Sequence, residues 1–211
     1  MTSTVLLSTA YFPPVHYLSL VAQSGSVLVE REENYIKQTY RNRCYILTSN
    51  GVISLTVPVL EGSFHKTPVK DIRIDYSKRW QQVHTRAIMS AYRSSPFFEF
   101  YFDSICNIIN SKTAFLIDLN MITLKFLTET AELKTDCSWT SHFEPELRNN
   151  DLRYTLTPKK KDFISRAFHF RPYIQVFSDR FGFVPGLSTL DLLFNAGPET
   201  IRYLPEYYNN I

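Results

Sequence analysis

The hydrophobic pattern of the first thirty residues predicts a strand, a helix and a second strand. Residues Val5 to Phe12, "VLLSTAYF", form an apolar run that passes into a polar loop. The next segment, "PPVHYLSLVAQ", has apolar positions at helical spacing, with Pro14 near its first turn. Ser26 to Glu30, "SVLVE", is a second apolar run. This order predicts a βαβ unit with two parallel strands and a right-handed crossover.

Apolar and polar residues alternate on both sides of Asn50-Gly51, which predicts an antiparallel hairpin. An Asn-Gly pair suits a two-residue type I′ turn, which would pair Ser49 with Val52. The alternation then separates a core face from a polar face. The core face carries Cys44, Ile46, Ile53, Leu55 and Val57, and the polar face carries Arg43, Tyr45, Ser54 and Thr56. Residues 69–76, "VKDIRIDY", predict one further strand.

Helical spacing begins at Trp80 and predicts a group of three helices. The first has an apolar stripe of Trp80, Val83, His84, Ala87, Ile88, Ala91 and Tyr92. The second is expected to start with Ser95 as N-cap and Pro96 at its first position, and the third covers residues 118–133. We expect these helices to pack against one another between Trp80 and Leu133.

The last third of the chain is less regular. Residues 135–165 are polar and are expected to form an irregular excursion or a weak boundary. "LSTLDLLFN" predicts a short helix closed near Gly197, and Pro198 opens another turn or short helix. We therefore predict a single α/β domain over residues 1–211, with a mixed sheet that is parallel at the βαβ unit and antiparallel at the hairpin, plus a cluster of helices.

Composition and charge disfavour several classes of protein. Hydrophobic residues make up 44% of the 211 residues, which is enough for a buried core, and no apolar run approaches the roughly 20 residues of a membrane span. The net charge is +3 and the only basic run is Lys159 to Lys161, so nucleic-acid binding is disfavoured. The three cysteines are Cys44, Cys106 and Cys137. They show no CxxC spacing, which favours a reducing cytoplasm over a disulfide framework. The 13 Tyr and 16 Phe suit a sugar-binding cleft, and equally a protein interface or the edge of a core.

Known catalytic and cofactor motifs do not occur in the sequence. The six glycines form neither a dinucleotide-binding loop nor a P-loop, and there is no GxSxG elbow. The five histidines form no HExxH or similar pair, so no bound metal is expected and the cofactor stays unknown. Cys137 and His142 are a weak candidate for a catalytic dyad. His84 lies on an apolar helical stripe, where a hydrogen-bonded core histidine is expected.

The stretch "QTYRNRCYIL" is the candidate for binding an anion. If it is extended, Arg41 and Arg43 point the same way, about 7 Å apart, and Tyr45 continues the row. Asn42 then points toward the core, where its amide can hold a neighbouring backbone. Pro58 has no N–H, so the ladder weakens beside Arg43. Two guanidinium groups facing the loop Ser8 to Pro14 suit a phosphate or a carboxylate, although a solvated strand edge would look the same in sequence.

Five sequence blocks occur in a recognisable order: "TAYFPPVHYL", "YRNRCYIL", "NGVISLTVPV", "AYRSSPFFEFY" and "FGFVPGLSTLDLLFNAGPETIRYL". As a set they resemble the WbqC-like family of bacterial proteins over nearly the whole chain. Tyr11 with Pro13 matches the family's opening Tyr-x-Pro, and Asn42-Arg43 matches its Asn-Arg pair. Later blocks are matched by Trp80, Pro96, Phe97, Phe98, Gln175, Phe177, Ser188, Asp191 and Asn195.

The chain departs from the family pattern at three places. The family commonly opens with His-Gln-Pro, where this chain has Ser8-Thr9-Ala10. His16 stands where a glycine is usual, and Gly186 replaces a usual asparagine. The missing first histidine is compatible with a different substrate or with no catalysis at all.

The resemblance implies a role in bacterial surface-polysaccharide (O-antigen type) biosynthesis. One hypothesis is a transferase that forms an acyl or aminoacyl amide on an amino-sugar or a nucleotide-linked sugar. The variant of a nucleotidyl-transfer pocket rests on the Pro–His start of the first helix. The alternative is a non-catalytic protein that binds a glycan precursor or a biosynthetic enzyme.

The partner expected in either case is an anionic or phosphorylated small molecule, such as a nucleotide sugar, and an oligomer is compatible with the sequence. Asp191 and Asn195 are four residues apart and share a helix face, which suits a substrate hydroxyl or the helix dipole. The substrate-binding residues expected are Tyr11, His16, Arg41, Asn42, Arg43, Tyr45, Asp191 and Asn195.

Overall fold

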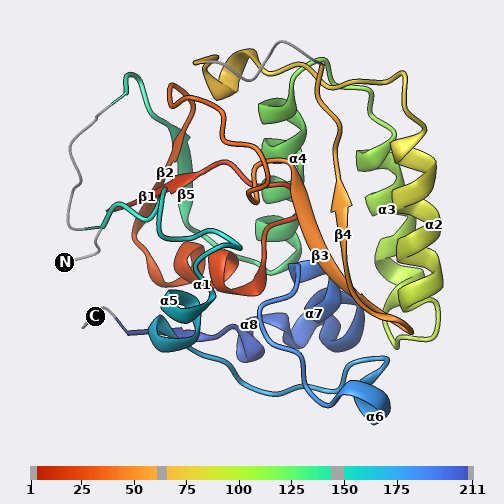
Figure 1. The fold of residues 1–211 in the computed structure, drawn as a ribbon. Coiled ribbons are helices and arrows are strands. Elements are labelled where there is room, and N and C mark those ends of the chain that lie inside the picture. The colour runs from red at the N-terminus through yellow and green to blue at the C-terminus, as the bar shows by residue number, and fades with distance from the viewer. Residues whose placement is uncertain (1–3, 61–65, 144–149, 209–211) are drawn as a thin grey trace.

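The structure, a computed structural model, describes residues 4–60, 66–143 and 150–208. It is a mixed α/β fold, as the sequence predicts. Figure 1 shows a parallel sheet on the left, the helices α2 and α3 on the right, and α4 with the hairpin β3–β4 between them. The helices α7 and α8 close the lower side.

The predicted βαβ unit is confirmed. β1 (Thr4–Ser8) and β2 (Ser26–Glu30) pair in parallel, with Leu6 opposite Leu28, and α1 (Val15–Gln23) connects them. The apolar run of β1 is buried because helices cover it, as is usual for parallel strands.

A third parallel strand, β5 (Asp136–Trp139), lies on the other side of β2. The expectation that residues 135–165 are irregular is therefore wrong at its start, and also at its end, where the helix α5 (Lys161–Ala167) begins. The strand is short and only half-buried, so its sequence lacks the apolar run that marks β1 and β2. Leu152 further along donates its N–H to the carbonyl of Leu6 and so covers the free edge of β1. Residues 144–149 of this stretch lie outside the described residues.

The hairpin forms between β3 (Arg43–Thr48) and β4 (Gly51–Thr56) and makes a separate two-stranded sheet. Its faces agree with the alternation in the sequence, although Ile53 is 36% exposed near the turn. The expected register is wrong by two residues, because Thr48 pairs with Gly51. Gly51 has a φ of +101°, whereas the two residues before it do not have positive φ, so the turn is not type I′.

Residues 69–76 do not form the expected strand. They begin with the 3-10 helix η1 (Val69–Asp71) and continue as an extended segment. Single bridges join Arg73 to Phe115 and Ile74 to Val59. The segment therefore lies between the start of α4 and the end of the hairpin, and neither bridge extends into a ladder.

The three expected helices are present and adjacent: α2 (Trp80–Tyr92), α3 (Phe98–Ile109) and α4 (Leu116–Thr130). The predicted start of α3 is wrong, because the helix begins at Phe98. The Ser95 hydroxyl donates to the carbonyl of Tyr92, so it ends the preceding turn and does not cap α3.

The C-terminal part consists of short elements. They are α5 (Lys161–Ala167), β6 (Phe168–His169), α6 (Ser178–Phe181), α7 (Thr189–Ala196), η2 (Gly197–Glu199), α8 (Thr200–Tyr203) and β7 (Glu206–Tyr207). The short helix closed near Gly197 is confirmed, and so is the new turn at Pro198. Ser188 caps α7 by accepting the N–H of Leu190.

Two hydrophobic clusters share α7. One packs the parallel sheet against α1, and it includes Leu192 and Leu193. The other packs the hairpin against α2, α3 and α4, and it includes Leu190 and Phe194. Because α7 is buried on all sides, it fixes the two clusters relative to each other. None of the helices among the described residues combines the length and apolar character that a membrane span requires.

Candidate functional site

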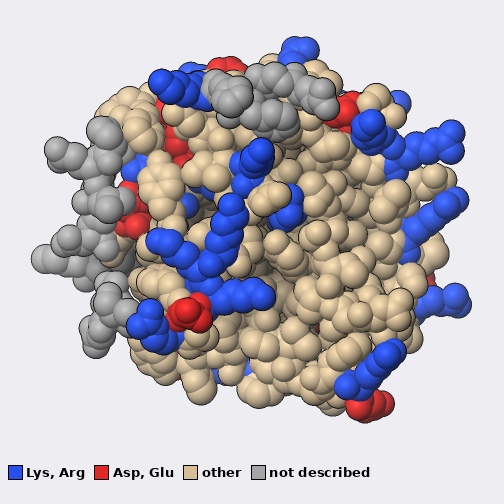
Figure 2. Space-filling model, viewed as in Figure 1, with Lys and Arg blue, Asp and Glu red and all other residues tan. Residues whose placement is uncertain are grey.

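A cavity of about 590 Å³ lies between α1, the hairpin, α5 and the segment before α7. Its lining is mostly aromatic and aliphatic: His16, Tyr40, Tyr45, Val52, Pro158, Lys161, Ile164, Ser165, Phe170, Val184, Pro185, Gly186 and Leu187. Figure 2 shows Lys and Arg side chains gathered over α5 and the segment leading into it, beside a hollowed part of this face. Volumes of about 300–1,000 Å³ with an apolar lining and a few polar groups are typical of small-molecule sites.

His16 is the deepest polar residue of the cavity. It lies in the first turn of α1, which is held in place because the Val15 N–H donates to the carbonyl of Leu187 (3.0 Å). The side chain is 1% exposed, and neither ring nitrogen has a hydrogen-bond partner among the described residues. Burial lowers the pKa of His16 to about 3, so its imidazole is neutral at physiological pH.

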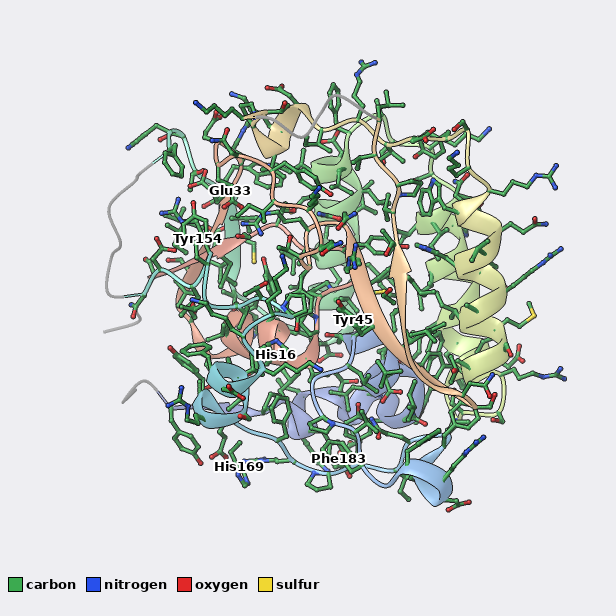
Figure 3. The ribbon with its side chains drawn as sticks, in the orientation of Figure 1. His16, Glu33, Tyr45, Tyr154, His169 and Phe183 are labelled. Atoms are coloured by element: carbon green, nitrogen blue, oxygen red, sulfur yellow. The ribbon has the colours of Figure 1, made fainter. Side chains whose placement is uncertain are left out.

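Aromatic rings form the wall beside His16. The ring of Tyr40 meets His16 edge to face, with centroids 5.7 Å apart, and meets Tyr45 in the same way at 6.2 Å. Phe170 lies 6.1 Å from His16, also edge to face. Figure 3 shows His16 and Tyr45 near the centre of the molecule in this view, with Phe183 below them. Flat rings of this kind suit the faces of sugars and bases.

Lys161 supplies a positive charge to the cavity. It is the first residue of α5, it is exposed, and it forms no ion pair within the described part of the chain. An ammonium group at this place suits a phosphate or carboxylate at the mouth of the cavity.

The wall formed by residues 184–187 is held by Gln175. Its side-chain oxygen accepts the N–H of Val184 (2.8 Å), and its Nε2 donates to the carbonyl of the same residue (3.0 Å). Gln175 Nε2 also donates to Asp191 Oδ2 (2.8 Å), which accepts the Tyr173 hydroxyl at 2.7 Å. Asp191 therefore supports the wall from behind and does not line the cavity.

Burial raises the pKa of the Asp191 carboxyl, and the hydrogen bonds from Tyr173 and Gln175 act against that shift. Asn195 donates its side-chain amide to the backbone carbonyl of Asp191 (2.7 Å). Asp191 and Asn195 thus share a helix face as expected, and the contacts of both lie within the protein.

Arg41 has a partner in its own chain. Its guanidinium binds Glu33 through two bonds, Nε to Oε1 at 2.9 Å and Nη2 to Oε2 at 2.7 Å. It also donates to the hydroxyls of Ser8 (2.6 Å) and Thr39 (3.1 Å). Arg41 does reach the loop that begins at Ser8, but the carboxylate that it holds is Glu33. Both side chains of this pair are almost fully buried, at 3% and 0% exposure.

Arg41 and Arg43 do not share a strand face, because β3 begins at Arg43 and Arg41 belongs to the preceding turn. Arg43 is half-buried, and its Nε has no hydrogen-bond partner among the described residues. The expectation for Asn42 is confirmed, because its amide donates to the carbonyl of Val57 (3.2 Å) from a buried position. The register places Thr56 opposite Arg43, so Pro58 lies beyond the ladder.

Tyr11 is buried in the second hydrophobic cluster, away from the cavity. Its hydroxyl contacts His84 Nδ1 (3.0 Å), and His84 Nε2 contacts the carbonyl of Thr56 (3.2 Å). Burial lowers the pKa of His84 to about 4. His84 is therefore the hydrogen-bonded core histidine that the sequence predicts. Of the eight substrate-binding residues expected from sequence, His16 and Tyr45 line the cavity.

Sequence reasoning missed a second buried ionic cluster at the carboxyl ends of β1 and β2. Arg153 binds Glu30 (2.6 Å) and Asp151 (2.6 Å), with all three side chains fully buried. Glu33 and Tyr154 lie near this edge of the sheet (Figure 3). The only signal in the sequence was the polar end of "SVLVE", because Asp151 and Arg153 come from the stretch that was expected to be irregular.

Sequence reasoning also missed the cavity residues Tyr40, Lys161 and Phe170, and the role of Gln175 in holding the cavity wall. Each comes from a loop or an element end, and no periodic pattern marks such residues in a sequence. No three His, Cys, Asp or Glu side chains of the described residues come close enough together to hold a metal ion.

A family profile described as "WbqC-like protein family" matches residues 9–162, which include His16, Tyr45 and Lys161. The chain belongs to the WbqC-like protein family. It is 26% identical over 233 residues to an uncharacterized protein of Mycobacterium tuberculosis, Rv1507c, with 97% of this chain and 98% of that protein covered. No solved structure matches the chain.

In this WbqC-like chain, the opening block Ser8-Thr9-Ala10 has a structural role at Ser8. The Ser8 hydroxyl accepts a hydrogen bond from Arg41 and donates to the carbonyl of Arg153 (3.1 Å). It therefore links the two buried ionic clusters. In chemical terms the cavity offers aromatic faces, one neutral imidazole and one ammonium group, and His16 forms no hydrogen bond to a hydroxyl or an amine of the described residues.

Proposed function

We propose that this WbqC-like protein takes part in surface-polysaccharide biosynthesis by binding an anionic glycan precursor, such as a nucleotide-linked sugar, in the cavity beside His16. The observation that carries this proposal is the unpartnered neutral imidazole of His16, which lies between aromatic walls and behind a basic mouth. A buried polar group without a partner is rare in proteins, and a bound ligand is one way to satisfy it.

The ligand class follows from the groups that face the cavity. The rings of Tyr40, Tyr45 and Phe170 suit a sugar or a base, and Lys161 suits a phosphate. The ligand class is thus inferred from the side chains of the site and not from the fold. Binding without chemistry is the form of the function that these groups support best, since a nucleophile with an adjacent base is not seen among them.

A second candidate is transfer of an acyl or aminoacyl group to an amino-sugar. It is favoured by one observation: His16 is unprotonated at neutral pH and can take a proton from an attacking amine. The low pKa of His16 makes it a weak base in the free protein, so this candidate requires that a bound ligand raise that pKa.

A thermal-shift screen against nucleotide-linked sugars, followed by calorimetry, tests the proposal. Lys161→Ala should weaken binding of the best ligand tenfold or more, because a charge-assisted bond is worth about 1.5–3 kcal/mol. The matched control is Lys125→Ala, which removes an exposed lysine from α4, and it should leave the affinity unchanged. Equal affinities for wild type and Lys161→Ala would contradict the site.

Mass spectrometry of the same mixtures separates the two candidates. Ligand recovered intact after incubation with acyl or aminoacyl donors supports a binding protein. A new amide-linked product that disappears in His16→Gln supports the transferase.

A further inference from the structure

We propose that His16 and Gly186 form a subsite for a neutral group that carries both a hydrogen-bond donor and an acceptor, namely an amide or a hydroxyl of the bound sugar. This inference rests on the proposed function, because it names what the deep end of the same cavity recognises. The anionic part of the ligand then lies toward Lys161.

The first reason is the isolation of the imidazole. Its neighbours are the rings of Tyr40, Phe168 and Phe170, at centroid distances of 5.7, 5.4 and 6.1 Å. Rings at these distances pack against His16 but leave both its nitrogens without a partner among the described residues. The side chain is 1% exposed, so bulk water does not replace the missing bonds.

The second reason is the missing side chain at Gly186. Its φ is +73°, and a Cβ built there would lie 3.8 Å from His16 Nδ1 and 3.9 Å from Phe170 Cζ. The glycine therefore leaves space beside Nδ1, and both residues line the cavity. A methyl group at Gly186 would occupy that space.

The third reason is the chemistry of a neutral imidazole, which has one N–H donor and one acceptor nitrogen. The two nitrogens point away from each other, so a group in the space at Gly186 reaches Nδ1, which donates in one tautomer and accepts in the other. A secondary amide and a hydroxyl each carry a donor and an acceptor and so fit Nδ1 in both tautomers. A phosphate offers acceptors alone and an ammonium offers donors alone, so each fits only one tautomer. A protonated His16 would match a phosphate better, but burial keeps the pKa of His16 near 3, so the imidazole stays neutral.

Calorimetry with three probes tests the subsite: UDP, UDP-glucose and UDP-N-acetylglucosamine. Both sugar compounds should bind more tightly than UDP, and His16→Phe should reduce their affinity about tenfold while UDP is unaffected. Preference for UDP-N-acetylglucosamine identifies the group as the amide, and equal binding of the two sugars identifies it as a hydroxyl.

Gly186→Ala and Gly182→Ala provide a matched pair of variants. Gly182 has a φ of +65° and no atom within 4 Å of its built Cβ, so both variants share the backbone strain of a positive φ. Only Gly186→Ala puts a methyl beside His16. It should abolish the preference for the sugar compounds over UDP, and Gly182→Ala should keep it.

The outcomes separate this inference from the proposed function. If UDP and its sugars bind with affinities that neither His16→Phe nor Gly186→Ala changes, the subsite is wrong, and a loss of affinity in Lys161→Ala then supports the proposed function on its own. If none of the three binds, the nucleotide-sugar proposal fails, and ¹⁵N resonances of His16 titrated with N-methylacetamide then decide the subsite alone. Shifts in wild type that are lost in Gly186→Ala support it, and no shift in wild type overturns it.

Discussion

At the scale of single residues, the arginine-rich stretch contributes a buried ion pair, because Arg41 binds Glu33 of its own chain. A guanidinium group fits a carboxylate of the protein as well as one of a ligand, so sequence could not distinguish the two for Arg41. The partner, Glu33, lies eight residues earlier in a loop, where no helical or strand periodicity places it. The buried position of Asn42 was predictable because the alternation that buries Cys44 extends one residue beyond the start of β3.

We predict that Glu33→Gln lowers the free energy of unfolding by about 3 kcal/mol, because it leaves the buried Arg41 without its counter-charge. Urea denaturation at neutral pH measures this. The control is Glu129→Gln, which removes an exposed partner of Lys125 and should cost less than about 0.5 kcal/mol. Similar losses in the two variants would show that the Arg41–Glu33 pair is not a buried stabilising contact.

His16 should also make stability depend on pH. Its folded pKa of about 3 lies below the ordinary value of 6.5, so the unfolded chain binds the proton more readily. The contribution of His16 to the free energy of unfolding is therefore fully present above pH 6.5 and decreases as the pH falls toward 3. Between pH 7 and pH 5 the loss from His16 is about 2 kcal/mol.

Chemical denaturation at these two pH values checks the prediction. His16→Phe should remove about that part of the loss, whereas His169→Gln, a change at an exposed position, should retain it. A loss that is identical in wild type and His16→Phe would mean that His16 is accessible to protons in the folded state.

At the scale of elements, the helices and strands with a strong apolar pattern were predictable from the sequence, and those with a weak pattern were not. The helices α2 and α4 follow from apolar stripes, and β1 and β2 follow from apolar runs. β5 escaped prediction because "DCSW" is short and polar, and becomes a strand only by pairing with β2. Tertiary pairing decides such segments, and local sequence carries little of that information.

The end of α7 offers a prediction at this scale. Gly197 caps the helix with a φ of +53°, and a Cβ there would lie 2.5 Å from the ring of Phe97. Backbone strain alone would lower the free energy of unfolding by roughly 1 kcal/mol. Because the methyl group of Gly197→Ala also meets the ring, we expect a loss of about 2 kcal/mol or more.

Thermal or urea denaturation compares this variant with Gly182→Ala, which has a positive φ and open space around its Cβ. The larger loss should belong to Gly197→Ala. If the two losses are equal, the contact between α7 and the start of α3 is looser than the structure shows.

At the scale of the whole molecule, the cavity exists because distant segments meet around α7. Ser188 donates its N–H to the carbonyl of Tyr45 (2.8 Å) and its hydroxyl to the carbonyl of Phe12 (2.8 Å). These bonds hold the hairpin, the loop before α1 and the wall of the cavity together. The sequence supplied His16 and Tyr45 as candidates, but their meeting depends on contacts between residues more than a hundred positions apart.

A crystal structure of the protein soaked with UDP-N-acetylglucosamine tests the central claim most directly. We expect the ligand in the cavity, with its rings against Tyr45, its phosphates within about 3 Å of the Lys161 ammonium, and a polar group of the sugar at His16. An empty cavity at saturating ligand, or a ligand bound elsewhere on the protein, would contradict the account.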